Sequence, residues 1–258
     1  MSLIVMCAYD TVENGRSELT EKTLQSLMET VDFERHEIIL VSNASCKRTE
    51  LAFRNFQDRV GKNCQTIMML TNLGTAKAIN AGWERRKPGQ HCIKIDNDVV
   101  IHSKGWVDEL EEAIKRMPEI GIIGLKRKDL IECTTYPDLN FRSALAQLPH
   151  NPGERWIHIE VVKGVMGTCK MINVALLDKI GYLYQPTVYG FDDSLYSCRS
   201  TLAGFINCFL PHIEIDHIDP GGTDYTVWKQ EHAGVTAQLA QQLANDYVNG
   251  VRPIYESA

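Results

Sequence analysis

The first half of the chain alternates short, continuously apolar runs with segments whose apolar residues recur at helical spacing. The apolar runs predict strands at residues 3–8, 37–42, 66–70 and 92–95. The helical spacing predicts helices near residues 20–31, 51–60, 75–83 and 107–117, with Thr75 as the N-cap of the third. Because buried parallel strands read as continuous apolar runs, these units imply an α/β fold whose mainly parallel central sheet is flanked by helices on both faces.

The second half of the chain is less regular. Residues 120–125 predict a further strand, whereas residues 126–160 combine turn signals with scattered aromatic residues and indicate a long, partly irregular excursion. Further strands are expected at residues 161–172 and 206–215, and helices at residues 174–180, 193–203 and 225–247. Since no repeat or linker divides the chain, residues 1–258 are expected to form a single domain.

The composition excludes several classes of protein. With 44% hydrophobic and 23% charged residues, the chain is neither disordered nor collagen-like, and its net charge of −6 argues against a broad nucleic-acid-binding surface. No apolar run reaches the roughly 20 residues of a transmembrane segment, and the start shows no secretory signal. The eight cysteines form no C-x-x-C pair, which disfavours zinc and favours reduced thiols in a cytoplasmic protein.

Two carboxylates follow the strand predicted at residues 92–95. Asp96 and Asp98 stand where a buried strand ends at the carboxyl edge of the sheet, which is where open α/β sheets bind ligands. Hard divalent cations prefer oxygen ligands, so Asp98 is a candidate metal ligand and Asp96 a candidate for a ribose or for the ion through water. The alternative is a surface turn with two solvated acids, because a bare D-x-D motif is common.

Two other acidic or basic features are candidates for chemistry. Asp192 and Asp193 begin a predicted helix, where adjacent acids either stabilise the helix N-terminus or direct one carboxylate into a cleft as a general base. His217 follows a predicted strand. A single histidine is usually structural, but beside a divalent cation it becomes a candidate nitrogen ligand.

Short motifs follow one another in a fixed order along most of the chain. They are A-Y-D at 8–10, E-I-I-L-V-S-N-A-S at 37–45, N-L-G…A-I-N-A-G at 72–82, D-N-D at 96–98, G-T-C-K-M-I at 167–172, D-D at 192–193, Arg199 and L-A-G-F at 202–205. In this order and spacing they resemble the family 2 glycosyltransferases of the GT-A fold, from Ile4 to His217. The sequence departs from that pattern at Ser42, where the family usually has an aspartate.

The resemblance implies a role for each motif. The first half, residues 1–125, would bind a nucleotide-diphosphate sugar, with UDP as the expected nucleotide, and a Mn²⁺ or Mg²⁺ ion held by Asp98, Asp96 and His217. Aligning on Arg199 and Gly204 places Asp193 at the position of the family's base, with Asp192 as the alternative. The residues expected at the donor are Ala8, Tyr9, Asp10, Ser42, Asn43, Asn72, Gly74, Lys77, Asn80, Asp96 and Asn97.

The acceptor is expected to contact residues 126–220 and the helical tail at residues 221–258, and its chemistry stays open. A glycan, a lipid-linked sugar, a small metabolite and a modified base all remain possible acceptors. The resemblance implies transfer with inversion at the anomeric carbon.

Two other functions compete with sugar transfer. The D-x-D-x-V pattern at residues 96–100 also fits a phosphohydrolase of the haloacid dehalogenase type, although there the motif follows the first strand of the domain, whereas three strand–helix units precede it here. A GT-A-like module that binds a nucleotide sugar without catalysis is the second alternative.

Overall fold

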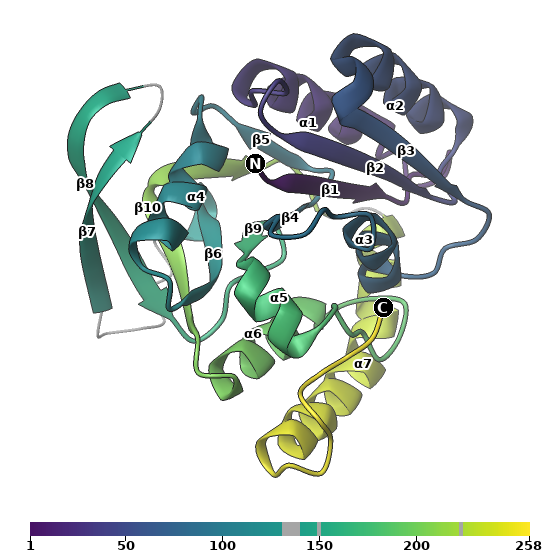
Figure 1. Cartoon of the computed structure of the whole chain (residues 1–258). Helices are drawn as coiled ribbons and strands as arrows, with labels where there is room; N and C mark the ends of the chain where they lie inside the picture. Colours follow the sequence, from purple (N-terminus) through teal and green to yellow (C-terminus); the bar gives the residue numbers. More distant parts are fainter. Residues whose placement is uncertain (131–139, 149–150, 222–223) are drawn as a thin grey trace.

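The computed structural model describes residues 1–130, 140–148, 151–221 and 224–258, whose strands form one ten-stranded sheet (Figure 1). Four parallel neighbours make up one side of this sheet, in the order β3-β2-β1-β4. They are β1 (Leu3–Ala8), β2 (Glu37–Asn43), β3 (Cys64–Met69) and β4 (Cys92–Ile95). Because these strands are parallel, their carboxyl ends meet at one edge, and the loops that follow them lie side by side.

The other side of the sheet combines parallel and antiparallel pairing in the order β9-β6-β10-β8-β7, and β5 also pairs with β10. The strand β9 lies antiparallel between β4 and β6, whereas β10 runs parallel to β6 and antiparallel to β5 and β8. The bounds are β5 (Val99–Ile101), β6 (Ile120–Arg127), β7 (Asn140–Leu148), β8 (Asn151–Val162), β9 (Cys169–Ile172) and β10 (Ile206–His217).

Helices cover both faces of the sheet, as the continuous apolar runs predict. Alternate residues of β1 point to opposite faces: Met6 packs in the core with α1, α2 and α4, and Val5 in the core with α3, α5 and α6. Gly82 lets α3 approach β1, since a Cβ there would lie 2.6 Å from Cγ1 of Val5. The helices are α1 (Ser17–Thr30), α2 (Lys47–Val60), α3 (Thr75–Trp83), α4 (Trp106–Arg116), α5 (Val174–Ile180), α6 (Asp192–Leu202) and α7 (Asp224–Val248), with short 3₁₀ helices η1 (Gly61–Asn63) and η2 (Lys128–Leu130).

Every strand and helix predicted in the first half exists, although α1 and α2 begin earlier than expected, at Ser17 and Lys47. The prediction of Thr75 as an N-cap is wrong. Gly74 occupies the N-cap with a φ of 85°, and Thr75 is the first helical residue. A residue distant in the chain supplies the missing acceptor, because Oε1 of Gln185 accepts a hydrogen bond from the N–H of Ala76 at 3.1 Å.

In the second half, the stretch at 126–160 contains the antiparallel hairpin of β7 and β8, which was not predicted, while residues 131–139 and 149–150 lie outside the description. The single strand expected at 161–172 is instead the end of β8 and the whole of β9, which occupy separate places in the sheet. The chain must therefore leave the sheet between them, and residues 163–168 form a loop.

The predicted state of the cysteines is confirmed for the described part of the chain. Seven cysteines are free, four of them buried, while Cys133 lies outside the described residues. Within the described residues, no helix has both the length and the apolarity needed to cross a membrane.

Candidate functional site

A cavity of about 530 Å³ opens at the carboxyl ends of β1 and β4 and reaches the start of α6. It brings together residues that are far apart in the sequence, from the loop after β1 to the end of β10. Nine of the residues singled out from the sequence line it: Tyr9, Asn43, Asn72, Asp96, Asn97, Asp98, Asp192, Asp193 and His217. The cavity therefore joins the D-x-D loop to the acidic start of α6.

A group of possible metal ligands lies at one end of this cavity. Asp98, His217 and Asp219 each offer a ligand atom, and these atoms lie within 4.8 Å of one another. The fold fixes them, because His217 pairs with Val99 across β10 and β5 and the N–H of Ile218 donates to the carbonyl of Asp98 at 2.9 Å. Carboxylate oxygens and an imidazole nitrogen form a donor set that suits Mn²⁺.

The carboxylate of Asp98 shows why a cation fits this group. Its side chain is buried, and Oδ1 has no hydrogen-bond partner among the residues that the structure describes. Burial by itself raises the pKa of Asp98, but hydrogen bonding and charge from His217 and Arg16 outweigh it and lower the pKa below its ordinary value. Asp98 is therefore an ionised carboxylate with one oxygen still available to a ligand.

Arg16 already contacts two of these carboxylates. Its Nη2 lies 2.5 Å from Oδ2 of Asp98 and its Nη1 lies 3.0 Å from Oδ2 of Asp219, and all three side chains are about 6% exposed. Nε2 of His217 lies 3.4 Å from the same oxygen of Asp98. Neither Arg16 nor Asp219 was expected at the site from the sequence. Asp219 could have been predicted, because residues two apart in an extended segment point to the same side of the chain and His217 was already a candidate ligand.

Asp96, expected beside the metal, is not a member of this group. Its Oδ1 lies 3.1 Å from Nζ of Lys94. The amine of Lys94 also donates to the carbonyl of Gly167 at 3.1 Å and lies 3.6 Å from Oδ2 of Asp192. Burial by itself lowers the pKa of Lys94, but Asp192 and Asp96 outweigh it and raise the pKa, so the amine stays charged. Lys94 thus links the D-x-D loop to the start of α6.

The acidic pair at the start of α6 has two different environments. Asp193 accepts hydrogen bonds from the N–H of Gly167 at 3.0 Å and from the N–H of Ser194 at 2.8 Å. Burial by itself raises the pKa of Asp193, but the charges of Lys170 and Lys94 outweigh it and lower the pKa. Asp192 is buried, and its Oδ2 has no hydrogen bond among the described residues. Both carboxylates line the cavity.

Lys170 is a second buried amine behind this acidic pair. It lies directly opposite Lys94 in the pairing of β4 with β9. Its side chain is fully buried, and its Nζ has no hydrogen-bond partner in the described part of the chain. Burial lowers the pKa of Lys170, and the attraction of Asp193 does not reverse this. Neither lysine was singled out from the sequence, since each reads as an interruption of an apolar strand.

The remaining residues expected at the donor do not line this cavity. Asp10 is fully buried and accepts hydrogen bonds from Thr20, Thr49 and Asn97. Oδ1 of Asn80 accepts from the N–H of Leu183 at 3.1 Å, and its Nδ2 donates to the carbonyl of the same residue at 2.9 Å. Three others, Ala8, Ser42 and Gly74, are buried, while Lys77 and Asn80 line a neighbouring hollow together with residues 183–188.

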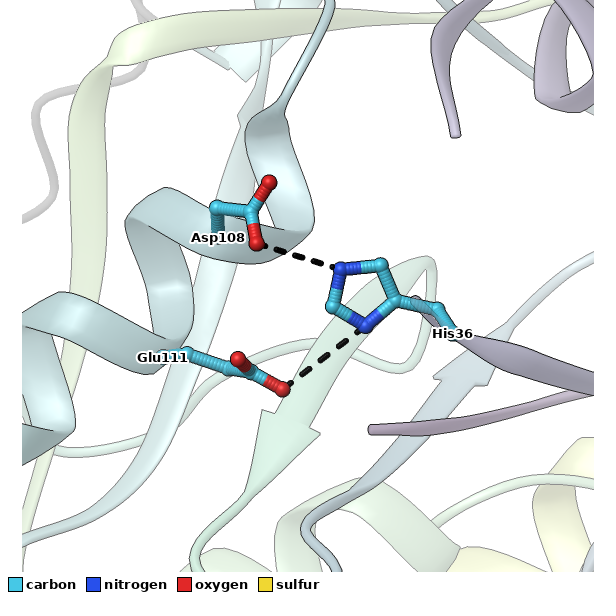
Figure 2. Close-up of side chains that lie close together, drawn as sticks. All are labelled: His36, Asp108 and Glu111. Atoms are coloured by element: carbon cyan, nitrogen blue, oxygen red, sulfur yellow. Dashed lines mark hydrogen bonds and ion pairs between the residues drawn. The ribbon is translucent and has the colours of Figure 1, made fainter. Parts of the chain in front are cut away.

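A second cluster of possible metal ligands lies between the start of β2 and α4, and Figure 2 shows its three side chains. His36 contacts Asp108 through Nε2 at 3.2 Å and Glu111 through Nδ1 at 3.7 Å. The N–H of Ser2 donates to Nδ1 at 3.2 Å, so both ring nitrogens are already engaged. We assign this cluster a structural role, in which it ties β1 and β2 to α4.

Solved structures that resemble this one share its fold. A mannosyltransferase from Pyrobaculum calidifontis, described with GDP-Man and Mn²⁺, superposes with a TM-score of 0.68 at 16% identity, over 93% of this chain and 64% of its own. GalNAc-T7 with UDP, GalNAc and Mn²⁺ gives 0.60 at 14% identity, over 85% and 44% of the two chains. S. aureus TarS 1–349 with UDP-GlcNAc gives 0.59 at 16% identity, over 96% and 72%.

These neighbours and the mixed sheet define a GT-A fold, as expected from the sequence. The family model for glycosyl transferase family 2 matches residues 3–181, and the chain belongs to that family. It spans less than two thirds of the length of the mannosyltransferase and of GalNAc-T7. No curated protein matches the sequence significantly.

Proposed function

We propose that this chain transfers a sugar from a nucleotide-diphosphate sugar to an acceptor hydroxyl, with inversion at the anomeric carbon. One observation carries the proposal: a single cavity is lined at one end by Asp98 and His217, and at the other by Asp192 and Asp193. The first group suits a metal–diphosphate and the second a proton acceptor. Similar structures that contain GDP-Man with Mn²⁺, or UDP-GlcNAc, support a donor of this class.

On the donor side, we place the diphosphate beside Asp98, His217 and Asp219. A divalent cation bound there would offset the negative charge that develops on the departing diphosphate. Tyr9, Asn43 and Asn72 line the same cavity on the side of β1 and β2, where we place the nucleoside. The donor nucleotide is proposed to be UDP.

On the acceptor side, we assign Asp193 as the base. The acceptor oxygen forms a bond to the anomeric carbon while the bond from that carbon to the diphosphate oxygen breaks, and the acceptor proton passes to Asp193. A carboxylate whose pKa is lowered is a weak base, so the proton moves late, when the attacking oxygen has become acidic. The hydrogen bonds from Gly167 and Ser194 hold the carboxylate in place.

Membership of family 2 argues against the phosphohydrolase alternative, and the position of the D-x-D motif after β4 agrees with this. A module that binds a donor without transferring its sugar remains the competing hypothesis.

We further propose that residues 1–258 act as one domain. A cytoplasmic location is also a proposal, supported by the free thiols of the seven described cysteines.

A screen of nucleotide sugars tests this function. Thermal unfolding is measured with UDP- and GDP-linked sugars, each with and without Mn²⁺, and the release of nucleoside diphosphate is then measured for each donor that raises the Tm. We expect one nucleotide class to raise the Tm more with Mn²⁺ than without it. Its nucleoside diphosphate should be released slowly when water is the only acceptor, and faster when a suitable acceptor is added. Binding without any release, across glycan, lipid-linked, metabolite and nucleobase acceptors, would instead indicate the non-catalytic module.

A further inference from the structure

We propose that Arg16 is a built-in competitor of the divalent cation: its guanidinium holds Asp98 and Asp219 in the metal-free protein and must leave them when the metal binds. This inference rests on the proposed function only in taking this group as the metal site. It concerns the residue that the cation must displace, and it can be tested without any sugar donor.

The contacts of Arg16 place it where a cation would bind. Its two terminal nitrogens reach the two carboxylates separately, Nη2 to Asp98 and Nη1 to Asp219. The same Oδ2 of Asp98 that accepts from Arg16 lies 3.4 Å from His217, so the arginine contacts the centre of the group of possible ligands. A cation bound to Oδ2 of both carboxylates would need the positions of these two nitrogens.

Electrostatics explains why the arginine is needed when no metal is bound. Asp98 is only 4% exposed, and its carboxylate lies within 4.8 Å of that of Asp219. Two buried carboxylates at this separation repel each other unless a positive charge lies between them. Arg16 supplies one positive charge and a divalent cation supplies two, so both satisfy the same carboxylates and the two compete.

The structure also offers the displaced side chain a place to go. The backbone of Arg16 is fixed at the N-cap of α1, where its N–H donates to Oδ1 of Asn14 at 3.2 Å. The side chain lines the cavity, as does that of Arg127. A guanidinium that leaves the carboxylates therefore remains in the cavity, where the negative diphosphate of the donor is proposed to lie. Guanidinium groups bind phosphate oxygens in a bidentate manner.

The test is a titration of each protein variant with Mn²⁺ alone, followed by calorimetry or by electron paramagnetic resonance of the free ion. We expect Arg16→Gln to bind Mn²⁺ at least about tenfold more tightly than the unchanged protein. Without metal its Tm should fall, and Mn²⁺ should raise that Tm by more than it raises the Tm of the unchanged protein. Arg16→Lys retains a positive charge but only one donor group, so its affinity for Mn²⁺ should lie between the two.

Two controls make the result specific to this site. Arg48→Gln removes an exposed arginine that pairs with Glu21, and it should leave Mn²⁺ binding unchanged. Adding Asp219→Asn to Arg16→Gln should abolish the gain in affinity. If Arg16→Gln folds only with Mn²⁺, that result also supports competition. The affinity for Mn²⁺ is then compared between Arg16→Lys and the unchanged protein.

Equal or weaker binding of Mn²⁺ by Arg16→Gln and Arg16→Lys overturns the inference, because Arg16 would then support the metal site or be unrelated to it. Absence of Mn²⁺ binding in every variant overturns it as well. Neither result decides the proposed function, which is judged separately by the release of nucleotide from the unchanged protein.

Discussion

Lys94 and Lys170 lie directly opposite each other in the antiparallel pairing of β4 and β9, and both side chains are buried. Like charges in this arrangement repel each other, and the two amines differ in how many oppositely charged or hydrogen-bonding partners stabilise them. Lys94 is held by Asp96, Asp192 and the carbonyl of Gly167, whereas Nζ of Lys170 has no hydrogen bond among the described residues. Such an arrangement lowers stability, so the role we expect for Lys170 is its effect on the pKa of Asp193.

Lys170→Met should therefore change the pH dependence of the activity without lowering the stability. The free energy of unfolding should be unchanged or higher, since an apolar side chain of similar length replaces an unpaired buried amine. The charge of Lys170 helps to lower the pKa of Asp193, so its removal raises that pKa and protonates the base at a higher pH. The acid limb of the rate of nucleotide release should therefore move to higher pH than in the unchanged protein.

Urea unfolding and a pH–rate profile measure the two effects. Lys163→Met, at an exposed position of the loop between β8 and β9, is the matched control and should change neither. A lower stability together with an unmoved acid limb would show that Lys170 is only a structural residue.

Gly167 has no room for a side chain. A Cβ at this position would lie 2.4 Å from Nζ of Lys94 and 3.8 Å from Cβ of Asp193. Gly167→Ala must therefore displace the Lys94 amine or the loop, at a cost of about 1–3 kcal/mol in the free energy of unfolding. Alanine keeps the backbone N–H that donates to Asp193, but a shifted loop moves this N–H and the Asp193 carboxylate out of place, so transfer should fall by about 100-fold.

The neighbouring Gly164 provides the control for that substitution. A Cβ there would lie no closer than 3.8 Å to any atom outside the adjoining residues, so Gly164→Ala should leave transfer and stability nearly unchanged. Thermal unfolding and the rate of nucleotide release distinguish the two variants. Equal activity of both would contradict the role assigned to the loop.

Asp193→Asn should leave donor binding nearly intact and lower transfer by about 10²–10⁴-fold, because the amide is nearly isosteric but cannot accept the proton. Asp192→Asn should lower it much less. The two variants have to be compared by kcat and by donor affinity in the same assay. An inactive Asp192→Asn beside an active Asp193→Asn would exchange the roles of the two carboxylates, and two active variants would exclude this mechanism.

Asp98→Asn should weaken the Mn²⁺-dependent binding of UDP by at least about 10-fold, because it removes charge from the centre of the ligand group. Asp96→Asn should weaken it less, since Asp96 faces Lys94 and lies outside that group. His217→Ala should also have a smaller effect than Asp98→Asn, as water can replace a neutral ligand. Calorimetric titration with UDP, with and without Mn²⁺, gives the comparison. Full retention of metal-dependent binding in Asp98→Asn would refute the assignment of the metal site.

Asn80→Ala should act on stability. Its side chain is 4% exposed and makes two hydrogen bonds to the backbone of Leu183, so its loss should cost about 1–3 kcal/mol of unfolding free energy. Lys77→Ala, one helical turn earlier and exposed, should cost little. Chemical denaturation measures both variants. A stable Asn80→Ala protein with weakened UDP affinity would favour the contact with the donor expected from the family resemblance.

The parallel half of the fold was predictable because β1, β2 and β4 are buried on both faces and read as apolar runs, whereas the edge strand β3 is only partly buried and its bounds were less exact. The sequence linked Asp98 and His217 only through the family resemblance; in the fold they meet because His217 ends β10 and pairs with Val99, the residue after Asp98. The hairpin of β7 and β8 was missed because its outward face carries apolar residues, with Phe141 and Trp156 more than half exposed, so that polar and apolar positions do not alternate clearly.

Arg16 and Lys94 could not be assigned from the sequence for a different reason. Their roles depend on partners that only the folded chain supplies: Asp219 for the arginine, and Asp192 and the carbonyl of Gly167 for the lysine. Periodicity predicts which residues are buried, but it does not indicate which buried charge neutralises which other charge.

The position of β9 has a consequence for synthesis of the chain. It joins β4 to β6 in the middle of the sheet, although it follows both in the sequence. When the ribosome has released the first 127 residues, β1 to β4 and β6 have emerged without the strand that connects them. Pairing between segments so distant in sequence is slow, because chain entropy is lost before the contacts form. Asp192, Asp193 and His217 follow β9 in the sequence, so the nascent chain can complete its cavity only after the central strand has been synthesised.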